Sequence, residues 1–371
     1  DRLLSMLPYW HSFALVAEVV MVMLAGACTI IPKDRRDFSK NLPTFKASII
    51  LVVPRMLSLF KASIEKAMAD KGATEIFKAC LENANELFSF YGDENEDPKV
   101  QETRQLFEPM IAQVRPFFGE NFRFFIGGGA PLDIEYQRFF QALDLPVFQG
   151  YGLTESSPVI SCNSPEEYKL GSSGKVLSWL HEQHGGHIVF QKEDGERGIG
   201  FEGELLVKGD CVMQGYWGHQ DESAKTIENG WLHTGDMGYL DEGFLYLTGR
   251  QSNLLCLKGG EKLHPEAVED KLKNHPHVSE AMIIGEGCKN VYAILNINDE
   301  TKATTNWKQE LAPLLSELNA YQKPKNYLIL PNFSVEEGTI TPTLKIRRKQ
   351  IWQLHGEVIN NFLQQNSESI S

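Results

Sequence analysis

FRFFIGGGAPLD, residues 122–133, is the stretch that decides the fold. Its apolar first half, Phe122–Ile126, predicts a short buried strand. The strand runs directly into the glycine turn Gly127–Gly129, which is followed by Ala130, and Asp133 is placed to cap a helix that extends to about Leu143. A strand, a glycine turn and a helix in this order indicate an α/β unit.

The sequence on both sides of this stretch continues the alternation. Ala47–Val53 predicts a strand, and helical periodicity follows Pro54 as far as an acidic loop at residues 91–99, which we expect to be a solvated turn. Pro146–Gln149 predicts a second strand, and the residues GYGLTE, 150–155, follow it directly. Several strands of this kind would form one layered α/β body.

Phe13–Ile31 is the most apolar stretch of the chain. Glu18 interrupts it, and the uninterrupted remainder is shorter than the ~20 residues that a membrane-spanning helix needs. We therefore expect a buried helix followed by a strand, and no transmembrane span.

The character of the sequence changes twice after residue 170. Short strands with frequent glycine predict a β-rich subdomain over residues 171–249, and a new alternation predicts a small, mobile α+β domain over residues 250–371, with its boundary near Arg250–Asn253. The fold class is therefore α/β, with residues 1–170 forming the α/β part of the larger domain. The expected later elements are strands at His187–Gln191, Gly203–Lys208, Gly243–Leu247, Val278–Ile284, Val291–Ile297 and Tyr327–Leu330, and helices at Pro265–Asn274 and about Thr305–Ala320.

Composition narrows the class of function. The 371 residues carry 36 Lys and Arg against 49 Asp and Glu, and the net charge of −13 argues against a protein that mainly binds nucleic acid. Any anionic substrate must therefore be held by a local site. The six cysteines form no C-x-x-C pair, which favours reduced, buried thiols in a cytoplasmic protein over disulfides or a zinc site. They are Cys28, Cys80, Cys162, Cys211, Cys256 and Cys288.

A glycine turn between a strand and a helix lets the backbone approach a flat or charged ligand, because no Cβ intrudes and the amides are free to donate. Taken alone, Gly127–Gly129 is better explained as a tight turn. The residues after the next strand change that interpretation, since Tyr151 offers an aromatic face to a base, Thr154 a hydroxyl to a phosphate and Glu155 a carboxylate to a divalent cation. Together these groups predict a nucleotide–Mg²⁺ site.

Two further clusters lie nearer the C-terminus. Asp236, at the end of Trp231–Asp236, and Arg250 could together hold the two hydroxyls of a ribose. Lys345, within Thr341–Arg348, could neutralise charge on a carboxylate and an α-phosphate during acyl transfer to phosphorus. Without that context, this last cluster is simply a basic loop.

These four clusters, in this order, resemble the adenylate-forming (AMP-binding) superfamily, which includes acyl-CoA synthetases, firefly luciferases and peptide-synthetase adenylation domains. LPYWHSF, at residues 7–13, is similar to the histidine-bearing segment beside the acyl pocket of that superfamily. Its Trp-His-Ser-Phe motif is most similar to the long-chain fatty acyl-CoA synthetases and the acyl-acyl-carrier-protein synthetases. The resemblance covers residues 5–350.

The resemblance implies a two-step reaction. A long-chain fatty acid and ATP give an acyl-adenylate and pyrophosphate, and the thiol of CoA, or of the phosphopantetheine of acyl carrier protein, then displaces AMP. Peripheral association with a membrane is left open. The implied roles are nucleotide binding for Gly127, Gly128, Gly129, Ala130, Gln149, Tyr151 and Gly152, ribose binding for Asp236 and Arg250, phosphate contact for Thr154, Mg²⁺ binding for Glu155, catalysis of adenylation for Lys345, and gating or lining of the acyl site for His11. A histidine packed in the core is the alternative for His11.

The chain departs from the family pattern in two places. The family carries a Ser/Thr/Gly-rich phosphate loop before the histidine segment, and residues 1–371 contain no equivalent. Gly171–Lys175 has a similar composition but follows the glutamate motif, so we interpret it as a turn. The second departure is Ser252, where the family usually carries Asp or Lys at the hinge between domains. The loop Gly259–Lys262, by contrast, matches the loop that the family brings to the thiol tunnel.

Two functional hypotheses follow from the missing phosphate loop. In the first, the chain is the C-terminal majority of a longer fatty acid–CoA ligase, through a fragment, a truncation or a split gene. In the second, it is a truncated, inactive chain that binds AMP, acyl-adenylate or a partner.

Two weaker features remain. The glycines within His181–His187 argue against a shared helical face for its three histidines, so we expect a surface loop and not a metal site. The basic run Lys345–Lys349 is either a docking site for carrier protein or CoA phosphates or the solvated start of a helix.

Overall fold

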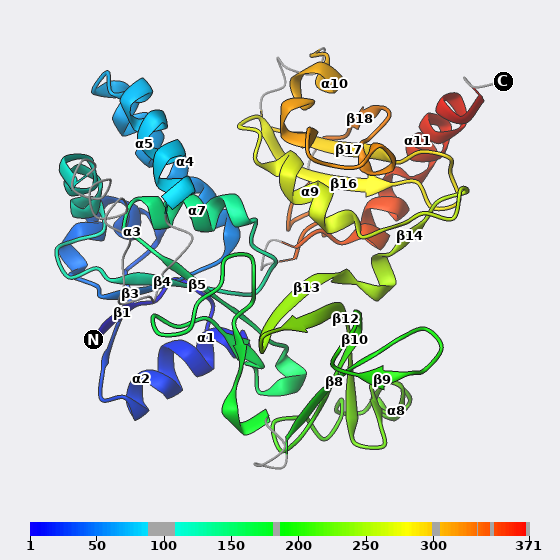
Figure 1. Cartoon of the computed structure of the whole chain (residues 1–371), viewed down its shortest axis with the longest axis horizontal. Helices are drawn as coiled ribbons and strands as arrows, with labels where there is room; N and C mark the ends of the chain where they lie inside the picture. Colours follow the sequence, from blue (N-terminus) through cyan, green and yellow to red (C-terminus); the bar gives the residue numbers. More distant parts are fainter. Residues whose placement is uncertain (88–107, 181–185, 299–304, 332, 342–344, 369–371) are drawn as a thin grey trace. The chain divides into compact units, whose positions relative to one another are not determined.

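The computed structural model describes the chain except for residues 88–107, 181–185, 299–304, 332, 342–344 and 369–371 (Figure 1). The chain forms two compact units: Asp1–Thr234 with Gly238–Leu247, and Gly235–Met237 with Thr248–Ser371. The expected acidic loop at residues 91–99, and His181 and His184, lie outside the described residues. The division of the first unit at residue 170 stays a prediction.

The first unit begins with a parallel sheet, as the alternating pattern predicts. Its strand order is β2 (Cys28–Ile30), β1 (Arg2–Leu4), β3 (Ile49–Val52), β4 (Phe124–Gly127) and β5 (Val147–Tyr151). Helices α4 (Pro54–Asp70), α5 (Thr74–Leu87) and α7 (Ile134–Ala142) cover one face of this sheet, and α1 (Ser12–Ala14) and α2 (Met21–Leu24) lie on the other (Figure 1). The side chain of Asp133 accepts the Glu135 amide and caps α7, as expected.

Alternate residues of the parallel strands feed two separate cores. On β3, Ile50 and Val52 join a core rich in phenylalanine beneath α4 and α7, in which the Phe60 and Phe118 ring centroids lie 5.2 Å apart. Leu51 belongs instead to the cluster that packs against α2. Both faces of the sheet are therefore buried, which is typical of parallel sheets.

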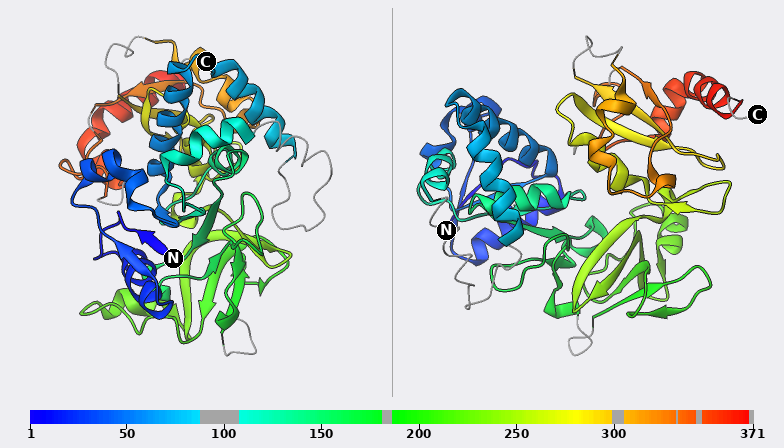
Figure 2. Two further views of the ribbon diagram at one scale, coloured as in Figure 1. Left: turned by 90° about the vertical axis from the view of Figure 1, so that its left-hand side faces the viewer. Right: turned by 45° about the horizontal axis from the view of Figure 1, so that its top comes forward.

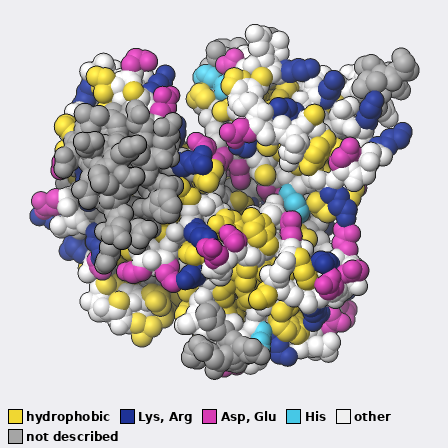
Figure 3. Space-filling view, in the orientation of Figure 1, with side chains coloured by type: hydrophobic (Ala, Val, Ile, Leu, Met, Phe, Trp, Pro, Cys, Tyr) yellow, Lys and Arg dark blue, Asp and Glu magenta, His cyan; other side chains and the backbone are white. Residues whose placement is uncertain are grey.

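The apolar stretch that begins at Phe13 forms a helix and then a strand, as predicted. It consists of α1 (Ser12–Ala14), a π-helix at Leu15–Val20 and α2 (Met21–Leu24), followed by β2. The prediction that this helix is buried is wrong: Met23 is 71% and Leu24 79% exposed, while Glu18 is fully buried. Figure 3 shows hydrophobic side chains at the surface where Figure 1 places α2. None of the helices in the described ranges has the length and hydropathy that a bilayer crossing requires.

The sheet continues into an antiparallel, β-rich region after β5. The strand order from β5 is β6 (Ser161–Cys162), β7 (Lys175–Val176), β13 (Phe244–Arg250), β12 (Trp231–Asp241), β10 (Gly203–Lys208), β8 (His187–Gln191) and β9 (Arg197–Gly198), with β11 (Ile227–Glu228) paired to β12 after helix α8 (Gln220–Thr226). The expected strands at 187–191 and 203–208 have the predicted bounds. The long strand β12 was not predicted, although its residues alternate between half-buried and buried positions from Trp231 to Gly238.

The second unit is a small α+β body built around the sheet β16 (Val278–Ile284), β17 (Tyr292–Ile297) and β18 (Tyr327–Ile329). Helix α9 (Pro265–Lys273) covers one face, where Ala281 and Ile283 join Val268. Helix α11 (Arg348–Glu368) covers the other, where Met282 and Ile284 join Ile351 (Figure 2). The small hairpin β14 (Leu255–Cys256) and β15 (Lys262–Leu263) precedes α9.

The expected helix over about Thr305–Ala320 is wrong in its length. The structure has only the short helix α10 (Trp307–Glu310) and two 3₁₀ turns, Pro313–Leu315 and Ala320–Gln322. Pro313 has no amide hydrogen to continue the ladder, and its ring obstructs the preceding turn.

The prediction of fully buried cysteines is wrong for the five thiols whose burial the structure describes. Cys28 and Cys256 are exposed, and Cys162, Cys211 and Cys288 are half-buried. The first two lie on the short strands β2 and β14. Burial raises the pKa of the Cys162 thiol to about 11.

A buried ion pair connects helices α9 and α11 of the second unit. The Arg348 guanidinium lies 2.5 and 2.6 Å from the two Glu269 oxygens and donates to the Ile283 carbonyl at 3.1 Å. Glu269 in turn accepts the Ile283 amide at 2.6 Å. Arg348 thus has a structural role at the start of α11, so its guanidinium is not available for docking an anion, which was one of the two interpretations of the basic run.

Arg348→Ala should destabilise the second unit by about 3–5 kcal/mol, because it leaves the Glu269 carboxylate buried without a counter-charge. Hydrogen exchange of the β16 and β17 amides reports this free energy for the unit itself. The exposed neighbour Arg347 provides the control, since Arg347→Ala should change it by no more than about 0.5 kcal/mol. Equal effects of the two substitutions would contradict the structural role of the pair.

Candidate functional site

The glycine turn lies at the carboxyl edge of the parallel sheet. Gly127 pairs with Gln149 and with Val52 on the neighbouring strands, and the Gly128 amide donates to the Val52 carbonyl at 3.2 Å. A Cβ on Gly128 would lie 3.0 Å from the Phe13 ring, so a side chain there would crowd that ring. The carboxyl edge of an open α/β sheet is where such folds bind ligands.

The second motif follows on the adjacent strand. Gly150 and Tyr151 end β5, and Thr154–Ser156 form a 3₁₀ turn. Gly152 cannot be replaced without moving the backbone, because a Cβ would lie 1.7 Å from the Pro158 carbonyl oxygen. The structure therefore brings the glycine turn and the Tyr151–Glu155 motif together, as the sequence predicts.

Contacts from two other segments fix the side chains of the second motif. The Ser12 and Thr154 hydroxyls lie 2.9 Å apart, which connects the histidine-bearing segment to the motif. The Tyr216 hydroxyl donates to a Glu155 oxygen at 2.8 Å, and the Met213 amide donates to the Glu155 carbonyl at 2.9 Å. Desolvation, together with the Glu155 carboxylate, raises the pKa of Tyr216, so it remains a donor.

Glu155 has the chemistry that Mg²⁺ requires. The ion prefers oxygen ligands and is commonly held by one or two carboxylates together with substrate phosphates. Glu155 is half-buried, and the Thr154 hydroxyl beside it is exposed. In the described part of the chain, no three His, Cys, Asp or Glu side chains gather into a metal cage. The residues present fit an ion that is shared with a phosphate.

Gln149 and His11 are each engaged by nearby protein groups. The Gln149 side chain is buried and accepts a hydrogen bond from Gln137 at 3.0 Å. His11 is half-buried and caps α1, where its Nδ1 accepts the Phe13 amide at 3.3 Å. Direct nucleotide or acyl contacts for these two side chains, and for Ala130, stay predictions.

The ribose and lysine clusters come together within the second unit. Asp236, on β12, is largely buried, and one of its oxygens lies 3.0 Å from Nε of Arg250, at the end of β13. Lys345 is exposed as a residue, yet desolvation of its amine and the nearby charge of Arg250 lower the pKa of Lys345, while Asp236 opposes that shift. These three side chains therefore form one electrostatic cluster.

The remaining glycine motifs are structural in the first unit and loop-forming in the second. A Cβ on Gly174 would lie 1.9 Å from the Cys162 backbone, and Lys175 pairs with Glu167, so Gly171–Lys175 is a turn, as expected. Gly259–Lys262 forms the end of the β14–β15 hairpin. Ser252 lies in a short 3₁₀ turn directly after Arg250.

Tyr216 is a site residue that sequence reasoning missed. It lies in the loop MQGYWGHQ, 213–220, far from Glu155 along the chain. The signal available in the sequence was the aromatic pair Tyr216–Trp217 next to two glycines. In the structure Trp217 is 99% exposed, so this pair marks a projecting loop.

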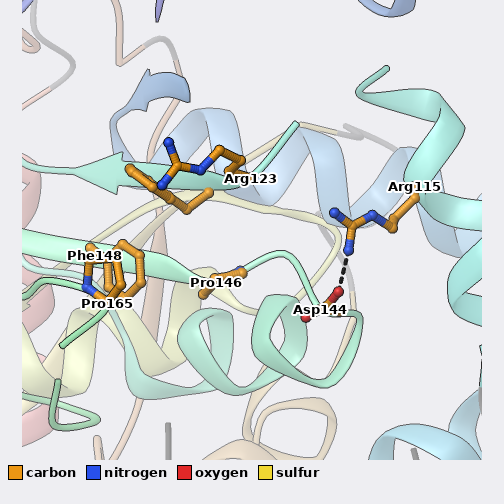
Figure 4. Close-up of a pocket in the computed structure, with 7 residues that line it drawn as sticks. Arg115, Arg123, Asp144, Pro146, Phe148 and Pro165 are labelled. Carbon is orange, nitrogen blue, oxygen red and sulfur yellow. Dashed lines mark hydrogen bonds and ion pairs between the residues drawn. The ribbon is translucent and has the colours of Figure 1, made fainter. Parts of the chain in front are cut away.

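A cavity of about 270 Å³ lies elsewhere in the first unit (Figure 4). Arg115 points at Asp144 and forms an ion pair with it, and Arg123 lies 2.9 Å from Asp1. Phe124 and Pro146, which also line it, are at the amino ends of β4 and β5. The cavity therefore lies at the edge of the sheet opposite the motifs, and its arginines are already paired.

Comparisons with known proteins agree with these motifs. The AMP-binding enzyme family model matches residues 1–217, and the AMP-binding enzyme C-terminal domain model matches residues 252–367. The chain therefore belongs to the AMP-binding enzymes, which confirms the resemblance to the adenylate-forming superfamily.

Within this superfamily the chain is similar to acyl-CoA ligases. It is 28% identical to the long-chain-fatty-acid–CoA ligase FadD15 of Mycobacterium bovis, over 95% of this chain and 60% of the relative. It is 26% identical to O-succinylbenzoate CoA synthetase (MenE) of Bacillus subtilis, whose complex with an acyl-adenylate intermediate matches with a TM-score of 0.65 over 95% of this chain and 60% of that one. The same enzyme with ATP and magnesium ion matches with a TM-score of 0.61, over 89% and 58%. The chain thus spans about 60% of the length of these relatives.

Proposed function

We propose that this chain is the nucleotide- and acyl-binding majority of an ATP-dependent fatty acid–CoA ligase. The observation that carries the proposal is the arrangement at the carboxyl edge of the first unit. There the glycine turn, Tyr151, Thr154 and Glu155 gather beside Ser12 and Phe13 of the histidine-bearing segment.

The proposed division of labour follows the chemistry of each group. In the first unit, Tyr151 and the turn bound the adenine, Thr154 contacts phosphate and Glu155 holds Mg²⁺, which would neutralise phosphate charge. In the second unit, Asp236 and Arg250 hold the ribose, and Lys345 stabilises the charge that develops during adenylation. The name of FadD15 supports a long-chain fatty acid as substrate, and the MenE complex with ATP and magnesium supports the two ligands.

A second candidate function rests on the sequence. Residues 1–371 contain no Ser/Thr/Gly-rich loop ahead of the histidine segment to grip the β- and γ-phosphates. A chain that binds AMP or acyl-adenylate without completing catalysis is therefore the alternative. The coding sequence upstream of residue 1 separates the two, since an intact Ser/Thr/Gly-rich loop followed by lysine at that place would make the chain part of an active ligase.

The acceptor thiol and the location in the cell are parts of the proposal. Release of AMP from a supplied acyl-adenylate, measured with CoA and with acyl carrier protein in turn, identifies the acceptor. We propose a cytoplasmic location, and flotation with vesicles tests for peripheral association with a membrane.

AMP or an acyl-adenylate analogue should bind the 371-residue chain more tightly than ATP does. The groups proposed for adenine, ribose and α-phosphate are present, whereas those for the β- and γ-phosphates are absent, so ATP would place extra charge where no cation compensates it. Calorimetry with each nucleotide measures the difference. Asp236→Asn should weaken AMP binding, and the exposed Asp221→Asn should not. Much tighter binding of ATP than of AMP would contradict this assignment.

A further inference from the structure

Glu18 is a buried carboxyl group that the proposed chemistry does not use. It lies in the π-helix Leu15–Val20 and is fully buried. Oε2 accepts a hydrogen bond from the Ser5 hydroxyl, and the backbone amides of Met6 and Leu7 also favour the charged form. Oε1 has no hydrogen-bond partner among the residues that the structure describes. A carboxyl group in such a place costs free energy, so its retention calls for a reason.

The surroundings of Glu18 are apolar. The cluster around this helix contains Leu3, Val22 and Leu51, with Ile126 from the strand beyond. The titratable and charged groups on the adjoining segments are Asp1, Arg2, Tyr9, His11 and Cys28, and none of them is among the groups that shift the pKa of Glu18. Burial raises the pKa of Glu18 to about 7, against an ordinary value of 4.5.

Glu18 joins the two ends of the histidine-bearing segment. Ser5–Leu7 leave β1 and lead directly to Pro8–His11, and the helix that follows brings the chain back to Glu18. The Glu18 carbonyl also accepts the Thr29 hydroxyl at 2.5 Å, and the Ser5 amide donates to the Ile30 carbonyl at 2.9 Å. The carboxyl therefore closes a loop of chain that is anchored to β2 at its base.

The far end of this closed loop touches both nucleotide motifs. Ser12 meets the Thr154 hydroxyl at 2.9 Å, and the Phe13 ring packs directly on Gly128. A shift of the loop would therefore move His11 and both of these contacts together. π-Helical turns occur frequently at functional sites, in keeping with a side chain that is held for a purpose.

We propose that Glu18 is a positioning residue, which holds the loop 5–18 closed and so places His11, Ser12 and Phe13 against Thr154 and Gly128. The inference rests on the function proposed above for those motifs. The neutral form of Glu18 suits the buried position, whereas the ionised form favours opening of the loop to water. The loop should therefore be firmest in acid and loosen as the pH rises through about 7.

Hydrogen exchange of the peptides within residues 5–18 tests the closure, with rates corrected for intrinsic base catalysis. The pKa of Glu18 is about 7 in the closed loop and should be the ordinary 4.5 in the open loop, so the two states bind different numbers of protons. The equilibrium constant for opening of the loop should therefore rise about tenfold from about pH 6 to about pH 8. Glu18→Gln should abolish this change because it cannot ionise. Glu65→Gln, at an exposed carboxylate on α4 in the same unit, should retain it.

Two further measurements complete the test. Ser5→Ala removes one hydrogen bond without removing the carboxyl, so it should lower protection of the same peptides at both pH values. Affinity for an acyl-adenylate analogue should fall with pH in the natural chain and stay level in Glu18→Gln. Any of three results would overturn the proposal. Protection of the 5–18 peptides could be independent of pH, or its pH dependence could persist in Glu18→Gln. The affinity for the acyl-adenylate analogue could also stay constant while the loop opens.

These readouts separate the inference from the proposed function. Failure of both AMP and the analogue to bind the natural chain would count against the proposed function, and the exchange data alone would then decide whether Glu18 closes the loop. Binding of AMP together with flat exchange profiles would leave the proposed function intact and overturn the role of Glu18.

Discussion

Lys345→Ala should lower acyl-adenylate formation by a factor on the order of 10² or more, which is the scale of removing one preorganised charge from a reacting centre. The measurement requires a form of the protein that carries a phosphate loop ahead of residue 1, as the family pattern implies. Desolvation and the charge of Arg250 lower the pKa of Lys345. The amine should therefore lose its proton at a lower pH than an ordinary lysine does. The rate of adenylation should fall over the same pH range.

The second half-reaction provides the contrast. Lys345 belongs to the second unit, whereas Thr154 and Glu155 belong to the first. If one unit rotates against the other between the half-reactions, as in the family, Gly259–Lys262 and not Lys345 serves thioester formation. Release of AMP from a supplied acyl-adenylate should then fall far less than adenylation does.

A matched control is available in the same basic run. Lys349 is exposed and lies four residues further on, so Lys349→Ala should leave both half-reactions near their natural rates. Equal losses of the two half-reactions in Lys345→Ala would mean that Lys345 is structural, or that no rotation occurs.

Glu155→Ala should abolish adenylation in the same loop-bearing form, because the loss of this ligand leaves Mg²⁺ and the triphosphate charge uncompensated. Pyrophosphate exchange as a function of Mg²⁺ concentration measures the effect. Exchange near the natural rate would exclude the metal role.

Three variants distinguish a metal ligand from a structural carboxylate. Glu155→Gln keeps an acceptor for the Tyr216 hydroxyl but removes the charge, so it should lose nearly as much activity as Glu155→Ala. Tyr216→Phe removes only the hydrogen bond and should cost less. Glu166→Ala, at an exposed carboxylate in the same unit, should have no effect. A greater loss in Tyr216→Phe than in Glu155→Gln would point to a structural role.

The sequence predicted correctly those helices and strands for which the local signals agree. The strand–glycine–helix unit around Gly127 was predictable because a short apolar run, a turn residue and the Asp133 cap agree with one another. The strands 278–284 and 187–191 were predictable because each is a short, mainly apolar stretch. Asp236 and Arg250 were predicted to form one cluster and Lys345 to belong to another, because spacing along the chain alone does not show that the three side chains come together.

The failures have physical causes of their own. The hydropathy of Phe13–Ile31 predicted a buried helix, yet a helix buries only the stripe of side chains that faces its sheet. Here Glu18, in the π-helix, is buried in that stripe, whereas Met23 and Leu24 are exposed. The contact between Tyr216 and Glu155 joins distant loops, so no local pattern could show it. The helix expected over residues 305–320 is interrupted at Pro313, because proline lacks an amide hydrogen and its ring obstructs the preceding turn.

The ion pair of the second unit has a meaning beyond stability. β16 is an edge strand with apolar residues on both faces, so alternation alone does little to fix its register. Glu269 takes the amide of Ile283, and Arg348 takes the carbonyl of that same residue. Only one register offers both groups to both helices at once. The pair therefore fixes the register of β16. It also occupies backbone groups through which this edge strand could otherwise pair with a strand of another chain.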